Sequence, residues 1–171
     1  EQVFPGLTPN LNALRQQSLS LEGIRQAPFT GWTIAGIIAS QCAFPALGEQ
    51  KHTLATPTAG VICLGDILKH NGYTLSYFNG ADLSFAGKDH FFHSHGYDKV
   101  WGKQELLKQL PEGREMSDWG VYDDDLFAAL ESEFDRLLAQ DQPFFLAALT
   151  VDTHPPYGYE NPYCRKLKPY G

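Results

Sequence analysis

The stretch from Asp123 to Leu149 constrains the fold most, because a long amphipathic segment runs into a continuous apolar one. Asp123 to Gln140 predicts a helix whose three opening Asp residues suit the positive end of the helix dipole. The side expected to face the core consists of Leu126, Phe127, Leu130, Phe134, Leu137 and Leu138. Phe144 to Leu149 predicts a buried strand, since an uninterrupted apolar run is typical of parallel sheets.

The same alternation of strand and helix runs through the rest of the chain. Further helices are expected after Thr8-Pro9, where Thr caps and Pro opens the first turn, and over Thr33–Ser40, Cys63–His70 and Gly87–Ser94. Further strands are expected at Ser20–Ile24, Thr74–Phe78 and Lys99–Trp101. This order predicts an α/β fold with a mostly parallel sheet.

Composition narrows the class of protein. The 171 residues are 43% hydrophobic and 19% charged, which suits one globular domain with a sizeable core. The net charge of −7, without a run of basic and aromatic residues, argues against a nucleic-acid partner. No apolar segment is long enough to span a bilayer. We expect residues 1–171 to be a partial domain, cut at both ends from a longer protein.

Functional residues are expected in the loops that follow the strands, because sites in parallel sheets lie beyond the carboxyl ends of the strands. One such loop contains Thr30 and Thr33, and Thr33 opens the small-residue helix. A hydroxyl there lies near unpaired amides and the positive end of the helix dipole, which favour an alkoxide and a bound phosphate. A Thr at a helix start is also an ordinary capping residue.

The cysteines leave two interpretations open. Cys42 and Cys63 flank a loop rich in Pro, Thr and Gly, and they either form a disulfide or remain two buried thiols. Cys164 is then left over. His90, His93 and His95 lie at the end of a helix that reads as an ordinary packed one, and we expect no metal site there.

Several short motifs resemble one family in their order along the chain. They are Thr8-Pro9-Asn10-Leu11, Thr30-Gly31-Trp32-Thr33, Ser40-Gln41-Cys42, Cys63-Leu64-Gly65-Asp66, Gly80-Ala81-Asp82, Ser94-His95-Gly96-Tyr97-Asp98, Ser117-Asp118-Trp119-Gly120 and Thr150-Val151-Asp152-Thr153-His154. This series resembles the phosphoglycerol transferase branch of the sulfatase/alkaline-phosphatase superfamily. The resemblance implies that superfamily's three-layer sandwich, of which this chain is an incomplete amino-terminal portion.

The resemblance also implies a threonine nucleophile that ligates a divalent metal and forms a phospho-threonine intermediate. Thr33 fits the family position at the helix start better than Thr30 does. His154 is implied to contact the substrate phosphate or to protonate the leaving group, chemistry that an imidazole performs near neutral pH. A loop histidine bonded to a backbone carbonyl is the plainer interpretation of His154.

Recognition of the phospholipid headgroup is implied in the loop with Asp82 and Lys88, with Trp32 as a wall of the pocket. Lys88 would pair with phosphate and Asp82 would accept from glycerol hydroxyls. The more distant lipoteichoic acid synthases call for a Trp and an Arg near Ala86 and Lys88, so this chain departs from them there. Two solvated charges and a buried aromatic ring are the alternatives.

The implied cofactor is a divalent metal, manganese first, with magnesium or zinc possible. Its ligands other than Thr33 are expected outside this chain, so we expect the segment alone to be inactive. The implied partners are a phospholipid donor and a periplasmic glucan or other polyol acceptor. The whole protein is expected at the periplasmic face of a bacterial inner membrane, with this segment soluble.

Three alternatives stay open. The first is a hydrolase of the same superfamily, acting on phosphodiesters or sulfuric esters. A sulfatase normally carries a Cys or Ser in a Cys-x-Pro-x-Arg-like motif, and no such motif is present. The second is a phosphoethanolamine transferase. The third is a non-catalytic α/β binding domain that kept the fold.

Overall fold

The computed structural model describes residues 6, 8–26, 31–43, 60–154, 158–159 and 161–162. Its helices are α1 (Pro9–Gln16), α2 (Thr33–Cys42), α3 (Leu64–His70), α4 (Lys88–Ser94), α5 (Lys103–Leu107) and α6 (Asp123–Leu138), with a 3-10 turn, η1 (Phe85–Gly87), before α4. Its strands are β1 (Thr74–Asn79), β2 (Lys99–Trp101) and β3 (Phe144–Leu149). None of the described helices is both long and apolar enough to cross a lipid bilayer.

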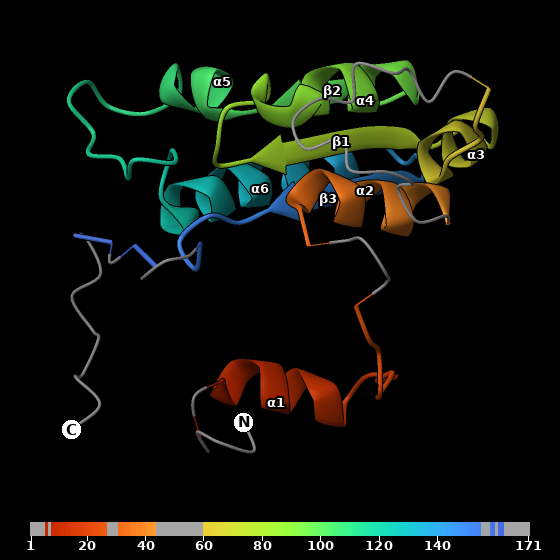
Figure 1. The fold of residues 1–171 in the computed structure, drawn as a ribbon, viewed down its shortest axis with the longest axis horizontal. Helices are drawn as coiled ribbons and strands as arrows, with labels where there is room; N and C mark the ends of the chain where they lie inside the picture. The colour runs from red at the N-terminus through yellow and green to blue at the C-terminus, as the bar shows by residue number, and fades with distance from the viewer. Residues whose placement is uncertain are drawn as a thin grey trace.

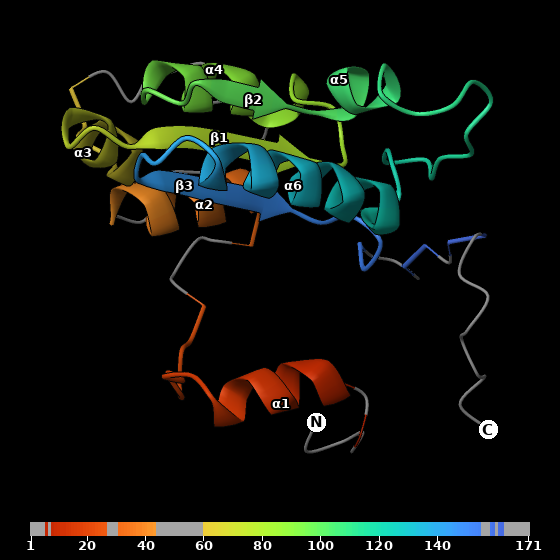
Figure 2. The same ribbon diagram turned by 180° about the vertical axis from the view of Figure 1, so that it is seen from behind.

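The strands form one parallel sheet in the order β2-β1-β3. Strand β1 pairs with β3 along its whole length, from Thr74 opposite Phe144 to Asn79 opposite Leu149. Figures 1 and 2, which view the molecule from opposite sides, show α2 and α4 on one face of this sheet and α6 on the other. The predicted α/β fold with a parallel sheet between helical layers is therefore confirmed.

Alternate residues of the central strand point to two different cores. Leu75 and Tyr77 lie in the core under α2 and α4, which we call the aromatic core. Its buried members are Ile38, Cys63, Leu75, Tyr77, Phe91, Phe92, Tyr97 and Val100. Phe78 lies in the opposite core, which we call the α6 core. Its buried members are Phe78, Leu106, Val121, Leu126 and Leu130.

A buried carboxylate adjoins the α6 core. Glu133 is only 2% exposed and accepts hydrogen bonds from Ser76 Oγ at 2.7 Å, Lys99 Nζ at 2.7 Å and Arg136 Nε at 2.8 Å. Burial alone would raise the pKa of Glu133, but the hydrogen bonds from Arg136, Lys99 and Ser76 outweigh it and hold the pKa at about 2. The carboxylate is therefore charged and fully partnered beneath β1.

The predicted core-facing side of α6 is only partly correct. Leu126, Leu130 and Leu137 are buried, whereas Phe127, Phe134 and Leu138 are exposed. Glu133 is buried in their stead, because its ion pairs offset the cost of taking a carboxylate out of water. Strand β3 is likewise half-buried, not fully buried, since it forms an edge of the described sheet.

The amino-terminal segment differs from its prediction. Helix α1 begins at Pro9 as expected, but Thr8 makes no side-chain capping bond and no residue of α1 is buried. The predicted strand Ser20–Ile24 is wrong: these residues form no strand pairing, Gly23 has a positive φ of 73°, and Leu21 and Ile24 are exposed. Alternation of apolar residues alone does not form a strand without a partner to pair with.

The remaining helices and strands agree with prediction to within a few residues, and α5 was not predicted. Helix α3 ends where Asn71-Gly72 was expected to end it, with Gly72 at a positive φ of 81°. Helix α5 is a single turn in which Glu105 accepts from the Gly102 amide at 3.0 Å. Most of the predicted loop from Ala43 to Val61 lies outside the described residues, as does Cys164.

Candidate active site

The candidate site lies at the carboxyl edge of the sheet. Figures 1 and 2 both show the amino-terminal end of α2 at the same edge as the arrowheads of β1 and β3. The loop after β1 contains Asp82 and leads to Lys88, and the loop after β3 contains His154. The fold thus gathers the segments that the strand-end rule singled out, except that Ser20–Ile24 is not a strand.

Thr33 is the first residue of α2, and its side chain is exposed. Trp32 precedes it as the N-cap in extended conformation, without a side-chain capping bond, and is 53% exposed. The first intrahelical bond runs from the Gly36 amide to the Trp32 carbonyl at 3.1 Å, so the amides of the first turn have no carbonyl partner within the helix. This end of α2 can therefore receive an anion. Thr30 lies outside the described residues.

The loop after β1 holds its two predicted charges differently. Asp82 accepts from the Ser84 hydroxyl at 2.6 Å and the Ser84 amide at 2.8 Å, and these bonds lower the pKa of Asp82. Lys88 is only 3% exposed, and its Nζ donates to the Phe85 carbonyl at 3.0 Å. Burial lowers the pKa of Lys88, with Asp82 and Asp89 opposing that shift. Lys88 is therefore a buried cation and not a solvated one.

Trp119 joins the two loops of the candidate site. The backbone forms an antiparallel bridge between Ala81 and Gly120, which brings Trp119 beside the loop after β1. The Trp119 ring packs edge-on against Phe85 with centroids 5.6 Å apart, and it tilts by 37° over the His154 ring with centroids 4.0 Å apart. Gly120 must lack a side chain, because a Cβ there would lie 2.0 Å from the Gly80 carbonyl oxygen.

The loop that carries His154 is fastened to the start of α6. The Asp123 carboxylate accepts from the Val151 amide at 2.8 Å and the Asp152 amide at 3.2 Å. Asp152 returns the interaction by accepting from the Asp123 amide at 3.1 Å. Burial raises the pKa of Asp152, and the charges of Asp123 and Asp124 add to that shift. Asp123, the first residue of the acidic run at 123–125, thus binds the loop after β3 in addition to interacting favourably with the helix dipole.

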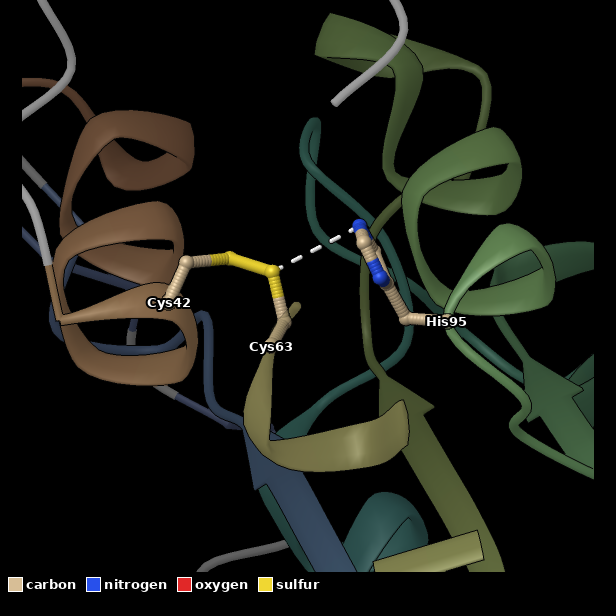
Figure 3. Close-up of side chains that lie close together, drawn as sticks. All are labelled: Cys42, Cys63 and His95. Atoms are coloured by element: carbon tan, nitrogen blue, oxygen red, sulfur yellow. Dashed lines mark hydrogen bonds between the residues drawn. A yellow bond between two sulfur atoms is a disulfide. The ribbon is translucent and has the colours of Figure 1, made fainter. Parts of the chain in front are cut away.

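A second cluster lies at the other end of α2, as Figure 3 shows. Cys42 and Cys63 form a disulfide, one of the two interpretations left open by the sequence. His95 is 4% exposed, and its Nε2 lies 3.6 Å from Cys63 Sγ. Within the described residues, Cys42, Cys63 and His95 are the one group of three His, Cys, Asp or Glu side chains whose ligand atoms all lie within 4.8 Å.

The positions of the possible metal ligands can be compared with the divalent metal site expected at Thr33. The described part of the chain gathers no set of His, Cys, Asp and Glu ligands around Thr33. The described residues therefore do not complete a metal site at that hydroxyl. His90 and His93 are exposed, and His93 Nδ1 lies 2.8 Å from the Asp89 carbonyl, as in an ordinary helix.

Comparison with known proteins identifies the family. The sulfatase family matches residues 5–169. The chain belongs to the sulfatase family. It is 41% identical over 171 residues to phosphoglycerol transferase I of Escherichia coli O6:K15:H31 (strain 536 / UPEC), and 40% identical to phosphoglycerol transferase I of Shigella boydii serotype 18. Each alignment covers 98% of this chain and 22% of the relative, so the chain spans about a fifth of the length of these curated relatives.

Two solved structures share the fold of this chain. A protein in the alkaline phosphatase superfamily from Vibrio parahaemolyticus is 26% identical, with a TM-score of 0.61 over 80% of this chain and 32% of that chain. The lipoteichoic acid synthase LtaP from Listeria monocytogenes shares the fold at 19% identity, with a TM-score of 0.74 over 89% of this chain and 36% of that chain. Enzymes of this superfamily generally use a divalent metal.

Sequence reasoning missed the contact of Trp119 with His154 at the candidate site and, in the second cluster, the approach of His95 to Cys63. It singled out Thr33 and His154 by family position, whereas Trp119 entered only as a member of one motif of the series. The signal available in the sequence was the aromatic side chain of Trp119, which directly precedes Gly120. The approach of His95 to Cys63 joins residues 32 positions apart, which no local pattern reveals.

Proposed function

We propose that the protein carrying this chain transfers a phosphoglycerol group from a phospholipid headgroup to an acceptor hydroxyl. One observation carries this proposal. Thr33 opens α2 at the carboxyl edge of the sheet, in a chain 41% identical to phosphoglycerol transferase I along 98% of its residues. A phosphoryl group at a helix start is favoured by the first-turn amides and the helix dipole.

The proposed reaction has two halves, with Thr33 as the nucleophile. Thr33 Oγ1 forms a bond to phosphorus while the bond from phosphorus to the diacylglycerol oxygen breaks. This step leaves a glycerophosphate ester on Thr33, and the hydroxyl proton of Thr33 is lost to solvent. In the second half, an acceptor hydroxyl attacks phosphorus and loses its proton to solvent, while the bond from phosphorus to Thr33 Oγ1 breaks and Thr33 Oγ1 takes up a proton. The first-turn amides favour the negative charge that develops on the phosphoryl oxygens.

His154 is the proposed proton donor to the departing oxygen. Its loop is held by the Asp123 carboxylate, and its ring is backed by Trp119 at 4.0 Å between centroids. A ring with a fixed orientation donates its proton along a defined direction, which general acid catalysis requires. We assign Trp119 a positioning role, because it contacts His154.

Headgroup binding is proposed for the loop between β1 and α4. Lys88, buried beneath Phe85, supplies a positive charge to that loop, and Asp82 supplies carboxylate oxygens for glycerol hydroxyls. Trp32, exposed beside Thr33, offers an aromatic wall. This assignment follows from the resemblance and from the position of these residues at one edge of the sheet.

We further propose a divalent metal at the Thr33 hydroxyl, manganese first among the candidates, with its other ligands outside the described residues. When bound, such an ion activates a hydroxyl and neutralises phosphoryl charge. The acceptor is proposed to be a periplasmic glucan or a related polyol. We expect the whole protein to act at the periplasmic face of a bacterial inner membrane.

Mass spectrometry of the full-length protein after exposure to a phosphatidylglycerol donor tests the proposal. The expected result is a glycerophosphate adduct on Thr33 that disappears on addition of a glucan acceptor. Thr33→Ala should lose the adduct and at least 100-fold of the transfer rate, whereas Thr30→Ala should keep both.

Other outcomes would redirect the assignment. An adduct on Thr30 would move the nucleophile three residues toward the amino terminus. A phosphoethanolamine adduct from a phosphatidylethanolamine donor, without a glycerophosphate adduct, would point to the phosphoethanolamine transferases. Release of free glycerophosphate to water at the same rate with and without acceptor would make the protein a hydrolase. Absence of any adduct or turnover would favour a binding domain.

A further inference from the structure

Three elements bring sulfur and imidazole together at the end of α2 remote from Thr33. Cys42 is the last residue of α2, Cys63 is the N-cap of α3, and His95 follows α4. Figure 3 shows the His95 ring directed at the sulfur of Cys63 from the side opposite α2. Cys63 is 1% exposed and His95 is 4% exposed, whereas Cys42 is partly exposed.

The spacing of these atoms suits a tetrahedral metal. Zinc bonds of about 2.3 Å to sulfur and about 2.0 Å to imidazole nitrogen, at a tetrahedral angle, separate the two ligand atoms by about 3.5 Å. His95 Nε2 lies 3.6 Å from Cys63 Sγ. Two sulfur ligands would lie about 3.8 Å apart around the same ion. The separation of His95 Nε2 from Cys63 Sγ is therefore already met, Cys42 Sγ lies within 4.8 Å of the same nitrogen, and the two sulfurs must part once the disulfide is reduced.

A carboxylate already orients the histidine. Asp66 Oδ2 lies 2.7 Å from His95 Nδ1 and accepts from the Cys63 amide at 2.8 Å. A carboxylate can only accept from the ring, so Nδ1 carries the proton and Nε2 is the nitrogen that faces sulfur. A carboxylate on the far nitrogen of a histidine is the usual second partner of a metal-bound imidazole.

We propose that Cys42, Cys63 and His95 bind one zinc-like divalent ion when the disulfide is reduced, with water as the fourth ligand. A dithiol attacks the partly exposed Cys42 sulfur, and Cys63 leaves as a thiolate beside His95. The mixed disulfide on Cys42 is then released by the second thiol, which yields an oxidised dithiol and two free cysteines. Metal binding displaces the two thiol protons to solvent.

This site does not depend on the proposed transfer reaction. Thr33 is not a member of the cluster, and the ligand set is sulfur and imidazole in place of the oxygen ligands that suit manganese or magnesium. Because Cys42 ends the helix that Thr33 begins, either the disulfide or the ion fastens α2 to α3. The two states are alternatives for one pair of sulfurs.

Cobalt titration of the reduced full-length protein tests the site, because thiolate–cobalt charge-transfer absorption arises only from sulfur ligands. The expected result is one sulfur-bound cobalt per chain, displaced by one equivalent of zinc, and none in the oxidised protein. Cys42→Ser and Cys63→Ser should each abolish the band. His95→Gln should weaken cobalt binding at least tenfold, and Asp66→Asn should weaken it 10- to 100-fold.

Matched controls separate this site from others. His93→Gln changes an exposed histidine two residues away, and Thr33→Ala changes the proposed nucleophile; both should leave the band unchanged. Cys164→Ser tests the remaining cysteine. Circular dichroism of each reduced variant checks its fold. The proposal is overturned by a reduced, folded wild-type protein without the band, or by a band that needs Cys164 and survives Cys42→Ser.

Discussion

The two faces of β1 are stabilised by different means. Leu75 and Tyr77 point into an aromatic core where Tyr77 stacks on Phe92 with centroids 3.5 Å apart. Ser76, between them, points to the opposite face and donates to the buried carboxylate of Glu133. One face thus relies on shape and apolar burial, and the other combines apolar packing with a charge network. Neighbouring residues of one strand should therefore respond to substitution in different ways.

Phe92→Ala should give the largest loss of stability. Phe92 is 2% exposed and contacts Tyr77, Phe91 and Tyr97 through its ring. Truncation leaves a cavity in the aromatic core, and we expect a loss of about 4 kcal/mol in the free energy of unfolding, measured by urea titration. Phe127→Ala, at a 56% exposed position on α6, is the matched control and should change it by about 0.5 kcal/mol or less. Equal losses would contradict the assignment of the core.

Glu133→Gln should lower the free energy of unfolding slightly less than Phe92→Ala does. It should act through the loss of a charge. The amide keeps the shape of the side chain but removes the partner of Lys99 and Arg136, so we expect a loss of about 3 kcal/mol. Calorimetry or urea titration near neutral pH measures it. Glu131→Gln, on an exposed turn of the same helix, should have little effect. A neutral result for Glu133→Gln would mean that apolar contacts alone support this face.

Acid should weaken the face that contains Glu133. The pKa of Glu133 is lowered from 4.5 to about 2 in the folded chain, so the unfolded chain binds the proton more readily. The stability from this carboxylate is therefore fully present above about pH 4.5 and is lost as the pH falls toward 2. We expect the stability of wild type to fall by up to about 3 kcal/mol more than that of Glu133→Gln across this interval. Parallel curves for the two proteins would contradict this pKa.

The smallest changes in the free energy of unfolding are expected at Ser76 and Tyr77, which are adjacent in β1. We expect the two changes to differ from each other. Ser76→Ala removes the 2.7 Å hydrogen bond to Glu133 and should cost about 1 kcal/mol. The Tyr77 hydroxyl is buried without a hydrogen-bond partner among the described residues, and burial raises its pKa. Tyr77→Phe should therefore leave the free energy of unfolding within about 0.5 kcal/mol of wild type, or raise it. A large loss for Tyr77→Phe would reveal a partner for that hydroxyl.

The sequence predicted the positions of helices and strands better than it predicted which residues pair or are buried. The α6 helix and the three strands follow from periodicity and apolar runs, which are local properties. The Ser20–Ile24 strand was wrong because pairing needs a neighbour, and half of the α6 face was wrong because Glu133 is buried by ion pairs from Lys99 and Arg136. Helix α5, with a single turn, is too short for a period to be detected.

The candidate site shows the same difference between what local sequence patterns predict and what tertiary contacts decide. Thr33 and His154 were singled out by the order of motifs, and their edge of the sheet by the strand-end rule. The stacking of Trp119 on His154 and the approach of His95 to the disulfide depend on how separate loops fold back. Such contacts are tertiary, and neither residue type nor spacing specifies them.

The reciprocal bonds between Asp123 and Asp152 also restrict how the chain can change in length. Two successive amides, Val151 and Asp152, donate to one carboxylate, and Asp152 accepts from the Asp123 amide in return. An inserted or deleted residue between Leu149 and Asp152 would move these two amides away from the Asp123 carboxylate. Relatives that keep this pair of aspartates should therefore keep the same number of residues from the end of β3 to Asp152.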